Sequence, residues 1–174
     1  DVFEKILNSD IEKIRKTLEE SNREDFYNAV DTIISAKRIY IVGTRSASAL
    51  ARFLAYYFNL MFENARFINT ASTSEMFEQI MRIEKGDVMI GISFPRYSKQ
   101  TAKALSFAAG NGAKVVAITD SLNSPIAEYS THTLIAKSDM ASFVDSLVAP
   151  MSLINALIIA IGIKKQDEIK TNFE

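Results

Sequence analysis

The sequence predicts an α/β fold: a three-layer αβα sandwich around a five-stranded parallel sheet, preceded by an N-terminal helical arm. Five short apolar runs rich in β-branched residues predict the buried strands. Segments with helical periodicity separate these runs. A helix between two strands brings the chain back to the end of the sheet where the first strand began, so the strands are expected to be parallel. The chain has 174 residues and is 48% hydrophobic, which suits a single domain over 1–174. We divide that domain into helices at 1–36 and an αβα core at 37–174.

The predicted arm contains two helices ahead of the first strand. Residues 2–20 form the first, and its apolar positions fall on one helical face at Leu7, Ile11, Ile14 and Leu18. Ser21 followed by Glu24 has the spacing of a capping box and predicts a second helix that runs to about residue 36. Such an arm either packs on a partner chain or covers one face of the sheet, and the pattern favours neither.

The elements of the core follow in order from the same signals. The predicted strands are residues 38–43, 65–69, 87–92, 114–119 and 133–136. The predicted helices between them are residues 49–62, 74–83 and 98–109, with one helical turn at 126–130. A last helix is expected from about residue 140 to 165, with a bend allowed at Pro150.

The most apolar stretch of the chain is residues 147–163, inside the last predicted helix. Pro150, Ser152 and Asn155 interrupt it, and it is short for a membrane span of about 20 residues. We therefore expect a buried helix and no membrane partner. The N-terminal residues alternate charged and apolar side chains, unlike a signal peptide, so we expect a cytoplasmic protein.

Composition excludes several classes of function. The 20 Lys and Arg residues balance 21 Asp and Glu residues, and no basic block suggests a nucleic-acid surface. The chain has no cysteine, so disulfides and thiolate metal sites are excluded. With a single histidine, His132, there is little material for a metal or haem site, and we expect no metal and no cofactor.

Four loops rich in Ser and Thr follow the predicted strands, at the sheet edge where ligands of parallel α/β folds bind. They are residues 43–48, 69–75, 93–98 and 119–124. Small hydroxyl side chains donate to oxygen and let a ligand approach the backbone, which suits a phosphate or a polyol. The first loop has one glycine, too few for a dinucleotide fingerprint, and it lacks the GK[ST] of a Walker loop.

The stretch 88–104 is the most informative, because an apolar strand there runs through a hydroxyl-bearing turn directly into a helix. The free N–H groups at the start of such a helix form an anion site. The candidate ligand-binding residues of this turn and its counterpart after the first strand are Arg45, Ser46, Ser48, Ser93, Arg96, Ser98 and Thr101. The alternatives stay open: the serines are only helix caps, and the arginines are solvated or at a subunit interface.

These residues resemble a known family. RIYIVGTRSASALA (38–51), GDVMIGISFPRYSKQTAKAL (86–105) and GAKVVAITDSLNSPIAEYS (112–130) are similar to the phosphosugar-binding sugar isomerase (SIS) domain. They are most similar to the effector domain of RpiR/MurR-type bacterial transcription regulators. In the SIS segment I-S-x-S-G-x-T, Ser93 matches the first serine and Ser98 the phosphate-binding threonine, while Pro95 and Arg96 replace the second serine and the glycine. Ser46 matches the serine of the first turn.

The resemblance implies a SIS fold with flavodoxin-like strand order and a domain that senses a sugar phosphate, as a homodimer or homotetramer. The helix-turn-helix domain of such regulators is absent from this chain, so DNA would be contacted only through a domain outside it. The alternative function is a phosphosugar isomerase, with Glu75 and His132 as its candidate acid–base residues. A weaker alternative is a nucleotide binder, and Asp120 and Asp145 are expected to be capping or loop carboxylates.

Overall fold

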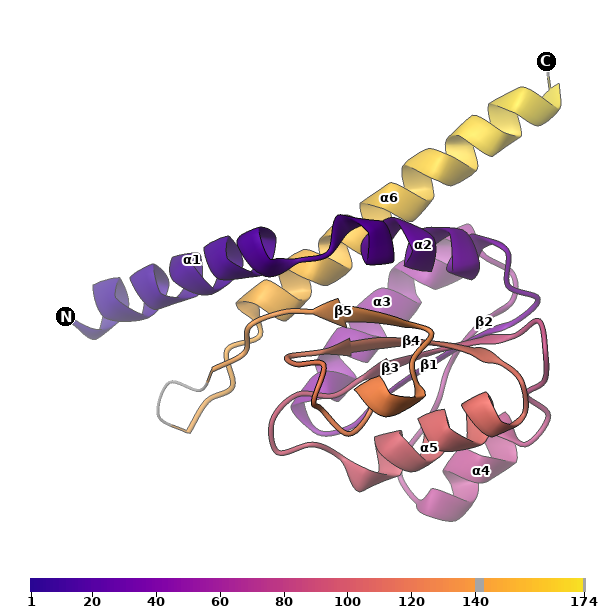
Figure 1. Cartoon of the computed structure of the whole chain (residues 1–174), viewed down its shortest axis with the longest axis horizontal. Coiled ribbons are helices and arrows are strands. Elements are labelled where there is room, and N and C mark those ends of the chain that lie inside the picture. Colours follow the sequence, from indigo (N-terminus) through magenta and orange to yellow (C-terminus); the bar gives the residue numbers. More distant parts are fainter. Residues whose placement is uncertain (140–142, 174) are drawn as a thin grey trace.

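The computed structural model describes residues 1–139 and 143–173. Its centre is one five-stranded parallel sheet with the strand order β2-β1-β3-β4-β5, which is the flavodoxin-like order expected from the sequence (Figure 1). The strands are β1 (Ile39–Gly43), β2 (Ala65–Phe67), β3 (Val88–Ile92), β4 (Lys114–Thr119) and β5 (His132–Ile135). The predicted α/β sandwich is therefore confirmed.

Burial explains why the central strands appear as continuous apolar runs. Every residue of β1 and β3 is buried, because helices cover both faces of the sheet there. Alternate residues of β1 enter different cores: Ile39 and Ile41 face one helical layer, and Tyr40 and Val42 face the other. The edge strands β2 and β5 are only partly buried, which is why their signals in the sequence are weaker.

The helices form two layers (Figure 1). One layer holds α2 (Arg23–Ile34), α3 (Ser46–Met61) and α6 (Val148–Phe173), and the other holds α4 (Thr73–Ile80) and α5 (Lys99–Gly110). A single 3-10 turn, η1 (Ala127–Tyr129), confirms the helical turn expected at 126–130.

The two helices of the arm have different surroundings. Helix α2 covers part of the sheet and buries Val30 and Ile33, whereas α1 (Val2–Glu20) lies beside α6 and leaves its apolar row exposed. Leu18, for example, is 64% exposed. The side of α1 that is buried carries Lys13 and Thr17 instead. Only α2 therefore fits the expectation that the arm covers the sheet.

The expected cap of α2 is wrong by one residue. Asn22 caps the helix, and its side chain accepts a hydrogen bond from the N–H of Asp25 at 3.0 Å. Ser21 instead ends α1, where its hydroxyl donates to the carbonyl of Thr17. Asn and Ser are both good caps, so the pattern alone did not select between neighbouring positions.

The last helix begins later than expected. Residues 140–142 of the expected range lie outside the described residues, residues 143–147 are not helical, and α6 starts at Val148. Pro150 falls in its first turn, where a missing N–H leaves no hydrogen bond unmade, so proline starts this helix and does not bend it.

One side of helix α6 is packed into the molecule. Ala149, Ile154, Leu157 and Ile161 are fully buried in the core shared with α3. By length and composition alone, the stretch Val148–Asp167 is also long and apolar enough to cross a membrane, and 33% of it is buried. A core helix meets the same criterion.

Candidate functional site

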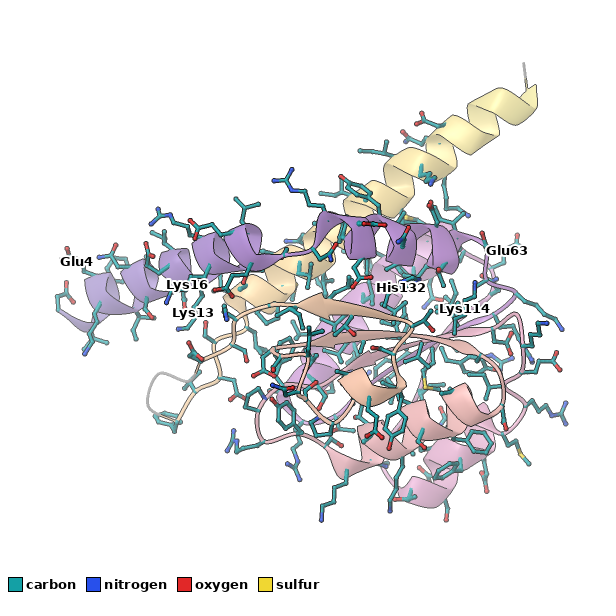
Figure 2. All side chains as sticks on the ribbon, viewed as in Figure 1. Glu4, Lys13, Lys16, Glu63, Lys114 and His132 are labelled. Atoms are coloured by element: carbon teal, nitrogen blue, oxygen red, sulfur yellow. The ribbon has the colours of Figure 1, made fainter. Side chains whose placement is uncertain are left out.

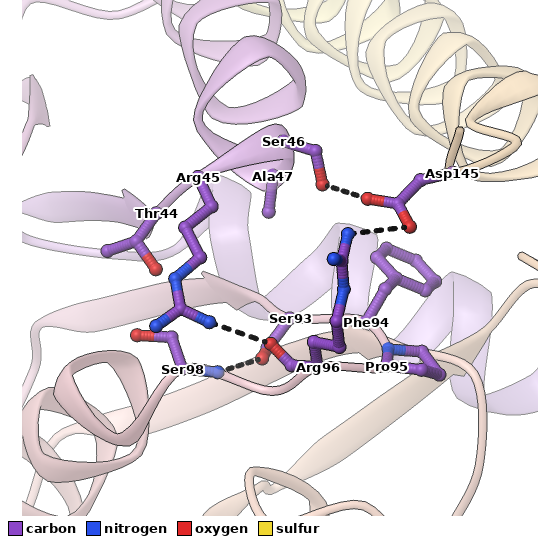
Figure 3. A pocket seen from close by; sticks show the side chains of 10 residues that line it. All are labelled: Thr44, Arg45, Ser46, Ala47, Ser93, Phe94, Pro95, Arg96, Ser98 and Asp145. Atoms are coloured by element: carbon purple, nitrogen blue, oxygen red, sulfur yellow. Dashed lines mark hydrogen bonds and ion pairs between the residues drawn. The ribbon is translucent and has the colours of Figure 1, made fainter. Parts of the chain in front are cut away.

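Two of the four Ser- and Thr-rich loops meet at the carboxyl edge of the sheet. They follow β1 and β3, which are neighbours, with Gly43 paired to Ile92 at their ends. Between them and the start of α3 lies a pocket of about 90 Å³ (Figure 3). Its lining residues are Thr44, Arg45, Ser46, Ala47, Ser93, Phe94, Pro95, Arg96, Ser98 and Asp145.

Ser93 and Ser98 stabilise the loop that follows β3, residues 93–98. The buried Ser93 Oγ accepts the N–H of Ser98 at 3.3 Å, and Ser98 Oγ accepts the N–H of Thr101 at 3.2 Å. Ser98 is therefore the N-cap of α5, which confirms the capping alternative for this residue. Both hydroxyls use an oxygen lone pair in these bonds, so each keeps its own hydrogen for an acceptor in the pocket.

Ser46 has a different role from the expected cap. It is the first residue of α3, whose N-cap position is Arg45 and has no side-chain capping bond. The Ser46 hydroxyl instead donates to Oδ2 of Asp145 at 2.7 Å. Gly43 allows this tight turn, because a Cβ at that position would lie 2.9 Å from the carbonyl oxygen of Ala47.

Both candidate arginines have an unusual, positive φ angle. Arg45 and Arg96 have φ = 56°, and they are the non-glycine residues with positive φ in the described chain. Such a conformation costs on the order of 1–3 kcal/mol and concentrates at functional sites. The Arg45 side chain donates to the carbonyl of Arg96 at 3.4 Å, and Arg96 forms an ion pair with Asp145 at 3.6 Å (Figure 3). Two guanidinium groups thus border the pocket.

A buried hydroxyl at the pocket has no partner. Thr44 Oγ1 is buried and makes no hydrogen bond in the described part of the chain, although Thr44 lines the pocket. A buried polar atom without a partner is costly, and a bound ligand oxygen would satisfy it. Thr101 Oγ1 is also buried and unpartnered, but neither Thr101 nor Ser48 lines the pocket. Those two candidates are not brought to the site.

The candidate isomerase residues lie elsewhere. Glu75 is exposed in the first turn of α4, where its N–H donates to the capping hydroxyl of Ser72 at 3.1 Å. His132 begins β5, at the amino edge of the sheet, and lies beneath α2 (Figure 2). Its Nε2 is 3.0 Å from Thr32 Oγ1, and its Nδ1 is 3.6 Å from Asp25. The acid–base pair considered from the sequence is therefore not assembled at this pocket.

The other two hydroxyl-rich loops contact the loop after β3 and the first turn of α5 from outside the pocket. Tyr97 donates from its hydroxyl to Oδ1 of Asp120 at 2.6 Å, and Gln100 donates to the carbonyl of Thr70 at 3.1 Å. Burial, followed by the hydrogen bond to Asp120, raises the pKa of Tyr97 from 10.0 to about 12. Asp120 is thus a structural acceptor, as expected of a loop carboxylate.

Asp145 is a site residue that sequence reasoning missed. It was expected to be a loop or capping carboxylate, but its side chain contacts Ser46 and Arg96 inside the pocket lining. It lies 99 residues from Ser46 along the chain, so no local pattern joins the two. Thr44 was also missed as a separate candidate, although its hydroxyl type and its place after β1 could have indicated it.

The donor set defines the class of site. Hydroxyl groups, two guanidinium groups and a helix N-terminus are suited to an anion, and phosphate is the usual anion at such an edge. Within the described residues, no group of three or more His, Cys, Asp or Glu side chains is arranged to hold a metal ion. The chain is therefore an α/β protein with a pocket at the carboxyl edge of its sheet, and the donors around this pocket are of the kind that suits an anion.

Comparison with known proteins specifies the family. The SIS domain family model matches residues 32–160, so this chain belongs to the SIS domain family. An HTH-type transcriptional regulator from Caldanaerobacter subterraneus is 26% identical over 97% of this chain. An HTH-type regulator from Haemophilus influenzae is 32% identical over 61% of it. The chain spans 60% and 36% of the lengths of these two regulators.

Solved structures give the same fold. The sugar isomerase domain of an RpiR transcription factor from Sphaerobacter thermophilus superposes with a TM-score of 0.88 and 28% identity, covering 94% of this chain and 90% of that one. The NanR protein of Vibrio vulnificus, complexed with ManNAc-6P, has a TM-score of 0.82 at 19% identity, covering 100% and 70%. Phosphoheptose isomerase GmhA from Neisseria gonorrhoeae has a TM-score of 0.77 at 17% identity, covering 93% and 99%. The resemblance to the effector domain of RpiR-type regulators is confirmed.

Proposed function

We propose that this chain is the phosphosugar-sensing domain of an RpiR-type transcription regulator, and that its pocket binds the phosphate group of the sugar phosphate. The observation that carries this proposal is the meeting of the two serine-bearing loops at one pocket, next to the unpartnered hydroxyl of Thr44. Ser46, Ser93 and Ser98 would donate hydroxyl hydrogens to phosphate oxygens, and Arg45 and Arg96 would add charge-assisted contacts.

The size of the pocket suggests how the ligand lies. Its volume of about 90 Å³ is well below the roughly 300–1,000 Å³ of pockets that enclose a whole small molecule. The phosphate would fill the pocket, and the sugar would extend beyond it. Similarity to NanR, a protein solved with ManNAc-6P, supports a sugar phosphate as the ligand class.

A binding role is favoured over isomerisation by the positions of the candidate catalytic side chains. Moving a proton between adjacent carbons requires a base and a proton shuttle close to the substrate. Neither Glu75 nor His132 lines the pocket, and His132 starts β5 at the opposite edge of the sheet. Isomerase activity is therefore the runner-up function.

The proposal extends to the assembly and location of the protein. Residues 1–174 would act as one effector domain in a cytoplasmic homodimer or homotetramer, with the exposed apolar row of α1 against a second copy. DNA would be contacted through a separate domain of the longer regulator, since the matched regulators exceed this chain in length.

Calorimetric titration with a panel of hexose and pentose phosphates tests the function. We expect one ligand class to bind, and Ser93→Ala with Ser98→Ala to weaken binding by a few kcal/mol, at about 0.5–1.5 kcal/mol per neutral hydrogen bond and more where the partner is charged. Ser106→Ala, on the outer side of α5, is the matched control and should bind normally. Unchanged affinity in the double variant would refute the site.

Nuclear magnetic resonance of the same mixtures separates the two functions. We expect no exchange between aldose and ketose phosphates during incubation with the protein. Turnover that disappears in Glu75→Gln would overturn the sensor and establish an isomerase. Saturable stabilisation by nucleotides, without any by sugar phosphates, would support a nucleotide binder instead.

A further inference from the structure

The pocket already contains an anion, the carboxylate of Asp145. Its side chain is 14% exposed, and each of its oxygens has a different partner at the site. Oδ2 accepts the Ser46 hydroxyl at 2.7 Å, and Oδ1 lies 3.6 Å from Nη2 of Arg96 (Figure 3). Ser46 and Arg96 are two of the groups that a bound phosphate would use.

A phosphate and the Asp145 carboxylate cannot both occupy these donors. The Ser46 hydroxyl has one hydrogen, so it donates either to Asp145 or to a phosphate oxygen. Two anions that share these donors also repel each other. Binding of phosphate therefore requires the carboxylate to leave.

Asp145 belongs to a segment that is attached to α1. The hydroxyl of the next residue, Ser146, donates to Oδ1 of Asp10 at 2.7 Å. Asp10 also lies 3.7 Å from the ammonium group of Lys13, whose side chain is 9% exposed. A movement of Asp145 out of the pocket would therefore strain a partly buried hydrogen bond between Ser146 and the arm.

A second attachment holds the beginning of the same connection. The N–H of Lys137, just after β5, donates to Thr17 Oγ1 at 3.0 Å, and the Lys137 ammonium group lies 2.7 Å from Glu20. Thr17 is buried on α1. Lys137 and Ser146 are therefore both hydrogen-bonded to residues of α1.

We propose that the Asp145 carboxylate competes with phosphate for the donors of the pocket, and that its displacement breaks the hydrogen bond between Ser146 and Asp10 of α1. This inference rests on the proposed phosphate site. It adds an autoinhibitory contact, whose loss on phosphate binding would change how α1 is held. In the free protein the carboxylate holds the pocket and α1 is tethered. In the bound protein the phosphate holds the pocket and the first half of α1 is released.

The test uses inorganic phosphate as the probe on the full 174-residue chain, with affinity measured by calorimetry. Removing a competing charged hydrogen bond is worth about tenfold in affinity, so we expect Asp145→Ala to bind phosphate about tenfold more tightly. Asp145→Asn retains a side chain of the same size without the charge and should gain less. Glu128→Ala changes the net charge equally, lies outside the pocket lining and should match the unaltered protein.

Hydrogen exchange of α1 provides the second measurement. We expect phosphate to speed amide exchange in residues 3–13 of the unaltered protein. Asp145→Ala and Ser146→Ala should each show the faster exchange without phosphate. If Asp145→Ala binds phosphate no more tightly, the competition is refuted, and if exchange in α1 never changes, the link to the arm is refuted.

The two proposals fail in different ways. Loss of phosphate binding in Ser93→Ala, together with unchanged binding in both Asp145 variants, would uphold the site and overturn only the competitor. Unchanged phosphate binding in Ser93→Ala would overturn the site itself. Absence of phosphate binding in every protein, including Asp145→Ala, would overturn both.

Discussion

The guanidinium of Arg45 donates to the backbone carbonyl of Arg96 over 3.4 Å, and both residues have φ = 56°. Each arginine occurs in the loop after a central strand, Arg45 directly before Ser46 and Arg96 two residues before Ser98. The two loops thus each carry a non-glycine residue with positive φ where they touch. The strain is located at the pocket, where a functional role would retain it.

Substitution of Arg45 tests this strain. Arg45 has φ = 56° and ψ = −131°, a combination that favours glycine and costs other residues on the order of 1–3 kcal/mol, so we expect Arg45→Gly to be more stable than Arg45→Ala by about 1 kcal/mol. Urea denaturation measures the difference. In α3, Arg52→Gly should be less stable than Arg52→Ala by about 1 kcal/mol, the usual order in a helix. The same order at both positions would show that Arg45 is not strained.

Gly43 is predicted to be essential for the pocket. A Cβ added there would lie 2.9 Å from the carbonyl oxygen of Ala47, which belongs to the backbone of the first turn of α3 and has to move. We expect Gly43→Ala to destabilise the protein by about 1–3 kcal/mol and to weaken phosphate binding. Thermal unfolding and calorimetry measure the two effects.

Gly110 is the matched control, because a Cβ there meets no atom within 4 Å and the residue is in the last turn of α5. Gly110→Ala should raise stability by about 0.4–1 kcal/mol and leave binding unchanged. Equal effects of the two substitutions would contradict the close approach at Gly43.

Alkaline pH is expected to weaken the hydrogen bond between Tyr97 and Asp120, which stabilises the loop after β3. The pKa of Tyr97 is raised from 10.0 to about 12 in the folded protein, so folding favours the protonated phenol. Its stabilising contribution is complete below pH 10.0 and is lost as the pH rises from 10.0 through about 12. Urea denaturation across this range should show a smaller alkaline loss in Tyr97→Phe, with Tyr27→Phe, an exposed tyrosine, as the control. A Tyr97→Phe protein with the same alkaline loss would disprove the assignment.

The exposed row on α1 predicts self-association. Leu7 and Ile11 are 48% and 51% exposed although they form the apolar face of the helix. We expect Leu7→Glu with Ile11→Glu to convert a dimer or tetramer to smaller species, as measured by analytical ultracentrifugation. Lys5→Glu with Lys16→Glu, on exposed positions of the same helix, should leave the assembly unchanged. A monomeric unaltered protein would refute this interface.

Local patterns predicted most of the fold because they depend on residues close in sequence. The apolar runs 38–43, 87–92 and 114–119 contain the strands β1, β3 and β4, since strands buried on both faces need apolar side chains at every position. The start of α6 was predicted wrongly, also for a local reason. Pro150 marks the first turn of a helix as readily as a bend, and only the packed structure distinguishes the two.

The candidate site was also predictable only in part. Ser46, Ser93, Ser98, Arg45 and Arg96 were predicted from their positions after strands, and the pocket contains all five. Ser48 and Thr101 share the same loops and helix starts but face elsewhere, because side-chain direction depends on where each helix begins. Local sequence identified the correct loops without fixing which hydroxyls point into the pocket.

The alternation of strands and helices, the hydroxyl-rich loops and the lack of cysteine follow from composition and short-range periodicity, so they were predictable from the amino-acid order alone. The meeting of the loops after β1 and β3, and the contact of Asp145 with Ser46 across 99 residues, arise from the packing of the folded chain. Strand order and the packing of a distant segment depend on long-range contacts, in which burial of the whole core outweighs any local preference.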